Sequence, residues 1–457
     1  MTTMAHDLDP LFAPRSVAVY GASAADPGKL GNKLLANAAD GAIPVVCVHP
    51  SAGEIAGVPA RPSLDRPVDL ALVSVPAAAA EKAVHDAVTA GARTVVVLSS
   101  GFGEAGPEGR AAEQRIVELV RAHGARLVGP NCMGVVSRLD DGTWLNGSYF
   151  WSVPRRAGAL SFVSQSGAFG GMFLSEVRRR ELGFARFLSL GNSPDVDVTH
   201  ALTWLASDPE TQVIGVFTEG LRDGRAFVEV ARSITPHKPV VVLKGGRGGA
   251  GARAVAGHTG SLAGSARAYE AGFQRAGVVS VEESAEFFDV LTAFSAPSFS
   301  GPSFSGPSPR RHGSRVAVVT VSGGPGVLAA DAAERHGLEL PPLPPRRQAA
   351  IRALAPEFAA LGNPVDLTPQ CPPANFRPAI RAVYEEDGID GVIVVNCGLD
   401  IPEFGAAVAE AFAATRKPTT AFLLDVGRVR KAVAGAGIPC FDLPESAVRG
   451  YAAGVAR

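Results

Sequence analysis

The amino-acid sequence predicts an α/β protein made of three layered domains in succession. Short apolar runs of the kind that form buried parallel strands recur along the 457 residues. Most of them lead through a small turn, often with glycine, into a stretch with the apolar spacing of a helix. The alternation is interrupted near residue 130 and again near residue 300, so we expect three blocks, each with its own sheet.

The composition fits a globular protein and excludes several classes of partner. Hydrophobic residues make up 46% of the chain, enough for each domain to bury a core. Lys and Arg total 43 against 44 Asp and Glu, a formal net charge of -1 at pH 7. No overall positive field attracts nucleic acid or an anionic membrane, so any phosphate binding must be local.

The cysteines and the N-terminal sequence bear on the compartment. The five cysteines form no CxxC pair, which indicates a reducing environment and no structural zinc or other metal site. The first residues have no basic start leading into an apolar core, and no apolar run reaches the ~18 residues of a membrane span. We therefore expect a cytoplasmic protein. The cysteines are Cys47, Cys132, Cys371, Cys397 and Cys440.

The first block, residues 1–129, is expected to form a doubly wound parallel sheet. Its first strand, at residues 16–20, leads into Gly21-Ala22-Ser23 and then into helical spacing from about residue 27. Further strands are expected at residues 45–48, 70–75 and 94–98, and helices at residues 77–90 and 111–123.

The second block, residues 130–296, repeats this plan, and residues 315–457 repeat it again as a flavodoxin-like domain. Residues 297–314 are rich in Pro, Ser and Gly and cannot bury enough apolar surface to order themselves, so we expect a flexible linker. The strands are expected at residues 159–163, 213–217 and 239–243 in the second block, and at residues 316–321, 391–395 and 420–424 in the third.

A glycine turn in the first block suits an anionic group. Gly21 and Ser23 precede Lys29 and Gly31 at a helix start, which supplies backbone N–H groups, a hydroxyl and one positive charge. The spacing matches neither a Walker A loop nor GxGxxG, so a tight turn needed only for packing stays open as the alternative.

Two later strands end in a similar turn. Ser164, Ser166 and Gly167 lead into a helix in the second block, and Gly323 and Gly324 lead into one in the third. The first N–H groups of a helix have no partner within it and are positively polarised. We expect the two helix N-termini to converge on one phosphate.

His258 is the strongest candidate for chemistry. It lies in a segment with little side-chain bulk, residues 257–264, which follows a strand and a glycine-rich stretch. We expect a loop that displays the ring so that it can accept and transfer a bulky group. Glu219 ends a strand of the same block, where its carboxylate can hold one ring nitrogen of His258 and raise the nucleophilicity of the other.

Other interpretations of these residues stay open. His258 can be an ordinary solvated loop histidine, and Glu219 an ordinary strand-end acid. A triad of His258 with Ser164 or Ser166 is a further alternative, although the chain has no GxSxG elbow there. Cys132 has no histidine close in sequence, so we do not expect it to be a nucleophile.

The motifs form an ordered set along the chain, and the set resembles the α subunits of the ADP-forming (NDP-forming) acyl-CoA synthetases, relatives of succinyl-CoA synthetase. The resemblance covers nearly the whole chain and is far more specific than any single motif. The matching motifs are Gly21-Ala22-Ser23, Pro27-Gly28-Lys29-Leu30-Gly31, Gly129-Pro130-Asn131-Cys132-Met133-Gly134, Ser164-Gln165-Ser166-Gly167, Gly191-Asn192 with Asp195-Val196-Asp197, Glu219-Gly220, His258-Thr259-Gly260-Ser261-Leu262-Ala263-Gly264 and Gly323-Gly324-Pro325-Gly326.

The resemblance implies a Rossmann-like CoA-binding domain followed by two flavodoxin-like domains of the succinyl-CoA synthetase type. It implies that His258 is phosphorylated, that Glu219 orients it, and that the helices after Ser164-Gln165-Ser166-Gly167 and at Gly323-Gly324 hold the phosphoryl group. Coenzyme A would be bound by Gly21, Ser23, Lys29 and Gly31 near its phosphates and by Asn131 near the thioester end.

The activity implied is that of an acid–thiol ligase, an acetate or acyl-CoA ligase that forms ADP. Acyl-CoA and phosphate give an acyl phosphate and CoA, the acyl phosphate phosphorylates the histidine, and phosphohistidine converts ADP to ATP, all reversibly. The cofactors implied are coenzyme A and ATP or ADP with Mg²⁺, the nucleotide held mainly by a partner. We expect an ATP-grasp β subunit as that partner, in a hetero-oligomer such as α₂β₂, or else an α dimer.

Two departures from the family pattern bear on the phosphate pocket, at Gly257 and at Val321-Ser322. Two other functions also stay open at this stage. One is an acyl transferase that works without nucleotide, and the other is a CoA-binding sensor or scaffold protein. The acyl group is not readable from the sequence.

Overall fold

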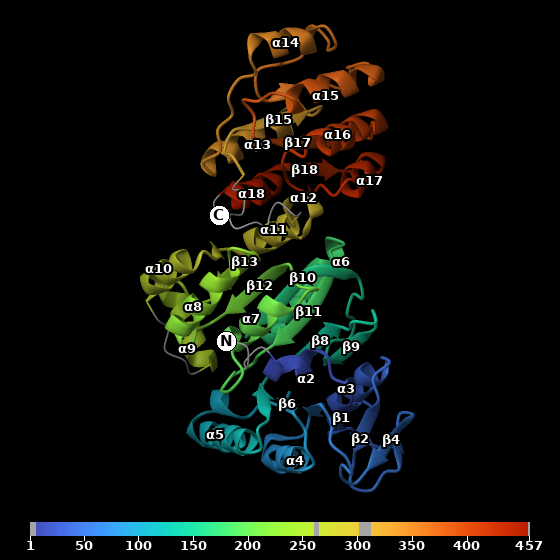
Figure 1. The fold of residues 1–457 in the computed structure, drawn as a ribbon, viewed down its shortest axis with the longest axis vertical. Helices are drawn as coiled ribbons and strands as arrows, with labels where there is room; N and C mark the ends of the chain where they lie inside the picture. Colours follow the sequence, from blue (N-terminus) through green and yellow to red (C-terminus); the bar gives the residue numbers. More distant parts are fainter. Residues whose placement is uncertain (1–5, 260–264, 301–311, 456–457) are drawn as a thin grey trace. The chain divides into compact units, whose positions relative to one another are not determined.

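The computed structural model describes residues 6–259, 265–300 and 312–455, in which helices and strands alternate along the chain (Figure 1). By their internal contacts the residues divide into two compact units, Met1–Ser280 and Val281–Arg457. The first unit holds two sheets, and the second holds a third. The α/β class predicted from the sequence is confirmed.

The first sheet has the strand order β3-β4-β2-β1-β5-β6-β7, with parallel pairing except between β3 and β4. The chain runs from β1 to β2 on one side and returns to pair β5 on the other side, so the strand order reverses beside β1. In open α/β sheets ligands bind at the carboxyl ends of the strands at such a reversal. The strands are β1 (Val17–Tyr20), β2 (Val45–Val48), β3 (Glu54–Ile55), β4 (Val58–Arg61), β5 (Leu70–Val73), β6 (Thr94–Val97) and β7 (Arg126–Val128).

Each predicted strand of this block is present within two residues of its predicted bounds, because continuous Val, Leu and Ala runs suit strands that are buried on both faces. The helices of the block are η1 (His6–Leu8), α2 (Asp9–Phe12), α3 (Leu30–Ala39), α4 (Ala77–Thr89), η2 (Gly103–Ala105) and α5 (Pro107–Ala122).

The second sheet has the order β14-β13-β12-β10-β11-β8-β9. Its β10 to β13 strands pair in parallel, whereas β8 and β9 form an antiparallel hairpin on the edge that the sequence analysis missed. An Asp141-Gly142 pair in the hairpin turn was the available signal. The strands are β8 (Gly134–Arg138), β9 (Trp144–Ser148), β10 (Ala157–Ser164), β11 (Phe184–Ser189), β12 (Val213–Thr218), β13 (Val240–Lys244) and β14 (Val279–Val281).

The two sheets of the first unit share one packed core. Leu72 of β5 and Val135 of β8 belong to the same buried cluster, and a Cβ at Gly147 would lie 3.2 Å from Leu72 Cδ1 and 3.3 Å from Val135 Cγ1. The helices that accompany the second sheet are α6 (Gly167–Arg179), α7 (Val198–Ser207), α8 (Gly224–Ile234), α9 (Gly249–Thr259) and α10 (Ala266–Ala276).

Helix α9 corrects one expectation. A loop was expected to display His258 after the glycine-rich stretch, but residues 249–259 are helical. Alanines alternate with the glycines there, and alanine has the highest helix propensity. Val255 is buried with its Cγ2 2.8 Å from the position that a Cβ at Gly246 would occupy, so tertiary packing stabilises this helix.

The second unit contains a parallel sheet with the order β16-β15-β17-β18-β19, the arrangement of flavodoxin-like folds. Its strands are β15 (Val316–Thr320), β16 (Val365–Asp366), β17 (Gly391–Cys397), β18 (Thr419–Leu424) and β19 (Cys440–Phe441). Its helices are α11 (Ser284–Ser295), α12 (Pro297–Ser300), α13 (Gly323–Arg335), α14 (Pro345–Arg352), η4 (Pro373–Asn375), α15 (Phe376–Tyr384), α16 (Pro402–Thr415), α17 (Gly427–Gly435) and α18 (Pro444–Val455).

Helix α11 packs in the second unit, where Asp289 accepts from Arg449 of α18 at 2.6 Å. The linker predicted at residues 297–314 begins with the short helix α12, and residues 301–311 lie outside the described part. The domain boundaries at residues 129, 296 and 314 stay a prediction. Among the helices of the described ranges, none is both long and apolar enough to cross a membrane.

Candidate functional site

A cavity of about 1020 Å³ opens at the carboxyl ends of the first sheet, where the strand order reverses, and extends to α6 of the second sheet. Both sheets belong to the same compact unit. The cavity therefore brings together turns that are more than a hundred residues apart in sequence. Of the predicted site residues, Gly21, Lys29, Gly31, Asn131, Ser166 and Gly167 line it.

Gly21 and Gly31 form a close contact at one end of the cavity. Gly21 has φ +102°, and a Cβ there would lie 2.1 Å from the carbonyl oxygen of Ser74. A Cβ at Gly31 would lie 2.1 Å from the carbonyl oxygen of Gly21. The two glycines thus let α3 begin directly on the turn after β1, with its first N–H groups at the cavity. The packing explanation and the anion-site explanation apply to the same residues.

Ser23, in contrast, is not among the cavity-lining residues. Its N–H donates to Asn32 Oδ1 at 2.6 Å, its carbonyl accepts from Asn32 Nδ2 at 2.8 Å, and its Oγ accepts from the N–H of Asp26 at 3.1 Å. Ser23 closes the loop that carries Lys29. The structure does not bring it to the cavity wall with Gly21 and Gly31.

Polar residues that the sequence analysis missed also line the cavity. Lys82 and Asp86 of α4 form an exposed ion pair at 2.7 Å, and His49 follows β2. The Nδ1 atom of His49 accepts N–H groups of residues 51 and 52, so its Nε2 carries the proton when the ring is neutral. In the sequence, the signal that could have pointed to Lys82, Asp86 and His49 is their position after a strand or on the helix that follows a strand.

Asn131 lies where the first sheet meets the second. It has φ +59°, its N–H donates to the carbonyl of Ser99 at 2.8 Å, and its Nδ2 donates to Asn192 Oδ1 at 3.3 Å. A left-handed backbone conformation is tolerated by Asn better than by most residues. The side chain of Asn131 is thereby fixed at the cavity wall.

Cys132 also lines the cavity but is unsuited to nucleophilic catalysis. Burial raises the pKa of its thiol to about 12, and the thiol donates to the carbonyl of Val97 at 3.4 Å. A thiol that stays protonated at neutral pH is a poor nucleophile.

The aromatic residues after this turn have separate roles. Trp144 and Phe150 pack on Phe184 and Phe187, with ring centroids 5.0 and 5.3 Å apart. Tyr149 lines the cavity, and its hydroxyl lies 2.5 Å from the Ser74 hydroxyl.

The turn between β10 and α6 presents a helix N-terminus to the cavity. Ser164 is buried, and its Oγ accepts the N–H of Ser166 at 3.1 Å and donates to the Ser166 carbonyl at 2.7 Å. Ser166 is the N-cap, with its Oγ accepting from the N–H of Phe169 at 3.2 Å. The N–H groups of Gly167 and Ala168, both at the cavity wall, have no partner within the helix. Ser164 supports the turn and does not line the cavity.

The second unit repeats this turn in its own sheet. The Oγ1 of Thr320 accepts the N–H of Ser322 at 2.8 Å and donates to the Ser322 carbonyl at 2.9 Å, and α13 begins at Gly323. Gly323 and Gly324 thus start a helix as predicted. The convergence of this helix with α6 on one phosphate stays a prediction.

Glu219 follows β12, and the Gln165 side chain lies beside it. The backbone N–H of Glu219 donates to Gln165 Oε1 at 2.6 Å. A Cβ at Gly245, after β13, would lie 3.7 Å from Glu219 Cγ, so the absence of a side chain at Gly245 leaves room for the Glu219 side chain. Lys244 is a buried neighbour: burial lowers the pKa of its ammonium group, and the charge of Glu219 opposes that shift.

His258 lies in the last turn of α9, which follows β13 after four residues. The structure describes its backbone but not its side chain, and residues 260–264 lie outside the described part. The pairing of His258 with Glu219 therefore stays a prediction. Strands β12 and β13 pair in parallel. Glu219 and the segment that leads into α9 therefore lie at the same edge of the sheet.

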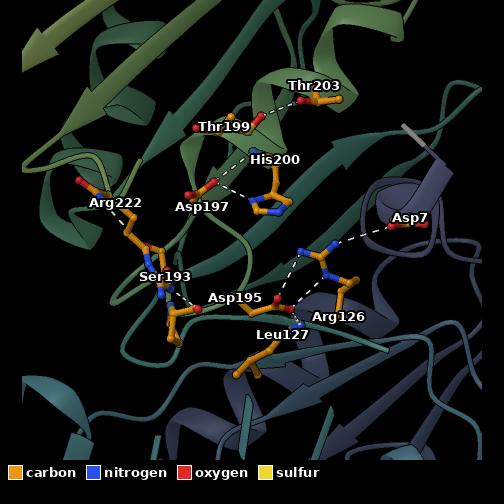
Figure 2. A network of polar contacts seen from close by, with 12 residues as sticks. Asp7, Arg126, Leu127, Ser193, Asp195, Asp197, Thr199, His200, Thr203 and Arg222 are labelled. Atoms are coloured by element: carbon orange, nitrogen blue, oxygen red, sulfur yellow. Dashed lines mark hydrogen bonds and ion pairs between the residues drawn. The ribbon is translucent and has the colours of Figure 1, made fainter. Parts of the chain in front are cut away.

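The loop after β11 fastens the second sheet to the first (Figure 2). Asp195 is buried and accepts the N–H of Leu127 at 2.8 Å, Arg126 Nε at 3.1 Å and Arg121 at 2.9 Å. Burial opposes ionisation of Asp195, but these hydrogen bonds and charges outweigh it and hold its pKa below the usual range. The loop also carries Asn192, the partner of Asn131.

Three protein families match successive parts of the chain. Residues 15–138 match the CoA binding domain, residues 157–294 the succinyl-CoA ligase like flavodoxin domain, and residues 316–424 the ligase-CoA domain. Each match covers most strands of one of the three sheets, in chain order.

Two named relatives align with most of this chain. The α subunit of acetate–CoA ligase [ADP-forming] II from Pyrococcus furiosus is 33% identical over 455 residues, covering 96% of this chain and 95% of the relative. Acetate–CoA ligase [ADP-forming] I from Archaeoglobus fulgidus is 36% identical over 394 residues, covering 85% of this chain and 54% of the relative. The chain thus spans about half of the second relative and nearly all of the first.

A solved structure has the same fold throughout. It is a dinucleotide forming acetyl-coenzyme A synthetase 1 from Ca. Korarchaeum cryptofilum, in complex with phosphate and ADP. The TM-score is 0.86 at 30% sequence identity, covering 98% of this chain and 96% of that one.

Proposed function

This chain belongs to the family of ADP-forming acyl-CoA ligase α subunits, and on that premise we propose that its cavity binds an acyl-CoA and that His258 carries the phosphoryl group. The activity is that of an acid–thiol ligase. It couples acyl-CoA, phosphate and ADP to carboxylate, CoA and ATP. The cavity is the observation that supports the proposal most strongly, because it joins the Gly21 turn to Asn131 and to the N-terminus of α6.

Coenzyme A would lie along the cavity. Its phosphates suit the end formed by Gly21, Lys29 and Gly31, where backbone N–H groups and one ammonium group are available. Its thioester end suits Asn131, on the path to the N-terminus of α6. The volume of about 1020 Å³ is at the upper end of the range for ligand sites, as a long cofactor requires.

In the first step an oxygen of inorganic phosphate attacks the thioester carbonyl. The C–S bond breaks, CoA leaves as the thiolate and takes up a proton, and an acyl phosphate remains. The N–H groups of Gly167 and Ala168 favour the negative charge of the attacking phosphate by the polarity of the helix N-terminus.

In the second step a ring nitrogen of His258 attacks the phosphorus of the acyl phosphate. The P–O bond breaks, the carboxylate leaves, and phosphohistidine forms. Glu219 would accept a hydrogen bond from the other ring nitrogen. This hydrogen bond stabilises the positive charge that develops on the ring. Lys244, buried nearby, would offset the negative charge gathered there.

The nucleotide step would use a partner subunit. ADP attacks the phosphohistidine phosphorus, so ATP forms and the neutral histidine returns. We assign the binding of ADP and Mg²⁺ to an ATP-grasp β subunit. Two observations on relatives support this: one is named an α subunit, and another is about twice as long as the matched region of this chain.

The experiment that tests the proposal uses the purified chain with phosphate and a panel of acyl-CoAs. Free CoA and acid-labile phosphorylation of the peptide that contains His258 are measured by mass spectrometry. Release of CoA with phosphorylation of that peptide would support the proposal and identify the acyl group. CoA binding with no phosphorylation, both alone and with a β subunit, would contradict it and favour a sensor.

A further inference from the structure

Asn192, in the loop after β11, uses nearly all of its hydrogen-bonding capacity. Its Nδ2 donates to Glu104 Oε2 at 2.6 Å and to Glu113 Oε2 at 2.7 Å, and its Oδ1 accepts from Asn131 Nδ2 at 3.3 Å. Only the NH₂ end of an amide can face two carboxylates, so the orientation of the Asn192 side chain is fixed.

The two carboxylates are themselves held in place. Glu104 accepts the N–H of Gly101 at 2.5 Å, and Glu113 accepts the N–H of Gly103 at 3.2 Å. Burial opposes ionisation of Glu104, but the hydrogen bonds from Asn192 and from the backbone outweigh it and lower its pKa. Asn192 therefore donates to a carboxylate that is charged at neutral pH, and such hydrogen bonds are stronger than neutral ones.

The backbones of the two asparagine turns are also in contact. The N–H of Asn192 donates to the carbonyl of Pro130 at 3.0 Å, and a Cβ at Gly191 would lie 2.1 Å from the same oxygen. The backbone of Asn131 is fixed from the first sheet through Ser99. The side chain of Asn131 is fixed from the second sheet through Asn192.

We propose that Asn192 is a positioning residue that sets the side-chain amide of Asn131 toward the thioester end of bound CoA. The inference rests on the proposed function of the cavity. With one Nδ2 proton given to Asn192, Asn131 keeps its other Nδ2 proton and its Oδ1 for a ligand. The segment η2, which carries Glu104, also lies against α9, the helix of His258. The network therefore lies between the CoA end of the site and the phosphoryl-carrying helix.

The test compares two ligands by calorimetry. One is CoA, and the other is adenosine 3′,5′-bisphosphate, which shares the nucleotide end of CoA but lacks the pantetheine arm. In Asn192→Asp the donor becomes a third carboxylate, so the orientation of Asn131 is lost. The Kd of CoA should rise about tenfold, the loss of roughly one hydrogen bond, while the Kd of the bisphosphate stays unchanged.

An exchange variant separates positioning from general support. In the double variant Asn192→Asp with Glu104→Gln, the amide and the carboxylate change places, so the donor–acceptor pairing between residues 192 and 104 returns, while the new carboxylate at position 192 still faces the Glu113 carboxylate. This variant should recover part of the CoA affinity that the single variant loses. Arg121→Gln is the matched control, because it weakens the same loop at Asp195 without touching Asn131. It should leave both Kd values unchanged.

The outcomes are distinct. The inference would be overturned if Asn192→Asp weakened the binding of both ligands equally or of neither. It would also be overturned if the double variant bound CoA as weakly as the single one, or if Arg121→Gln showed the same selective loss of CoA affinity. Failure of the unsubstituted chain to bind CoA would instead overturn the proposed function. If Asn192→Asp does not fold, Asn192→Ala asks the same question, because it removes the acceptor of Asn131 Nδ2, and a selective rise in the Kd of CoA is again expected.

Discussion

The backbone N–H of Glu219 donates to the side-chain oxygen of Gln165 at 2.6 Å. The same oxygen accepts from the N–H of Gly220 at 3.2 Å and from the hydroxyl of Thr218 at 2.8 Å, while Gln165 Nε2 donates to the Gly220 carbonyl at 3.0 Å. The Gln165 side chain thus forms hydrogen bonds with the backbone beyond the ends of β10 and β12, where the two strands no longer pair with each other. Since Gln165 also lines the cavity, the position of Glu219 is linked to the cavity wall.

Replacing Gln165 by Ala should therefore displace Glu219 without preventing CoA from binding. We expect the rate of His258 phosphorylation to fall by about 10²-fold, because misplacement of a catalytic group by about 1 Å has effects of that size. The rate is measured as acid-labile phosphate formed with time, beside the Kd of CoA. Gln212→Ala, at an exposed residue before β12, is the control. Equal rates in the Gln165 and Gln212 variants would contradict the link.

Replacing His258 by Asn should abolish phosphorylation and ATP formation, while acyl phosphate can still form from acyl-CoA and phosphate. Asn retains polarity but has no ring nitrogen to attack phosphorus. The measurement is phosphopeptide mass spectrometry together with CoA release. His123→Asn, on the exposed end of α5, serves as the control. Undiminished ATP synthesis by the His258 variant would rule out the phosphohistidine route.

Gly31→Ala should destabilise the fold and weaken CoA binding together. The added Cβ would meet the Gly21 carbonyl oxygen at 2.1 Å, so α3 must move away from the β1 turn. Overpacking of this kind costs about 1–3 kcal/mol. The free energy of unfolding and the Kd of CoA are measured. Gly53→Ala, where a Cβ meets nothing within 4 Å, should change neither value. Full stability and affinity in the Gly31→Ala variant would show that the turn tolerates the movement.

Met133→Ala should widen the range of acyl groups. Met133 lines the cavity beside Asn131, and its Cγ lies 2.6 Å from the position of a Cβ at Gly167, so it fills the space at the N-terminus of α6. Shortening it should raise kcat/KM for long acyl-CoAs relative to acetyl-CoA by about tenfold, as one or two methylenes are worth about 1–3 kcal/mol. The measurement is the ratio of kcat/KM across an acyl-CoA series. An unchanged ratio would place the acyl group elsewhere.

Asp195→Asn should lower stability at neutral pH by about 3 kcal/mol, the cost of breaking a buried ion pair. The folded pKa of Asp195 is depressed, so its contribution is fully present above the ordinary value of 3.8 and is lost as pH falls through the folded value. The difference between the two proteins should thus be constant from pH 7 to pH 5 and narrow in acid. Chemical unfolding at a series of pH values measures it. A difference that widens on acidification would contradict this sign.

The sequence predicted the strands well and the details of the site less evenly. The buried runs at β1, β5 and β13 could be recognised because parallel strands between helices are apolar on both faces. The β8–β9 hairpin and α9 were missed, since alternating strands and glycine-rich helices have weak local signals and depend on tertiary packing.

Within the site, sequence reasoning found Gly21, Lys29 and Gly31 because close turns demand glycine and anions demand charge. It could not assign a role to Gln165 or Asn192, the side chains that hold Glu219 and Asn131. Gln165 and Asn192 act through side-chain hydrogen bonds to segments far away in sequence, and such pairs have no local pattern. Ser23 shows the converse, since its motif is intact but its hydrogen bonds close a loop.

The hydroxyl-supported turns of Ser164 and Thr320 have a thermodynamic consequence. Each strand-end hydroxyl holds its turn through the same two hydrogen bonds before any ligand arrives, so neither helix N-terminus must reorganise to receive an anion. The entropy cost of ordering each turn is therefore met when the chain folds, and it would not reduce the affinity for an anion that binds there.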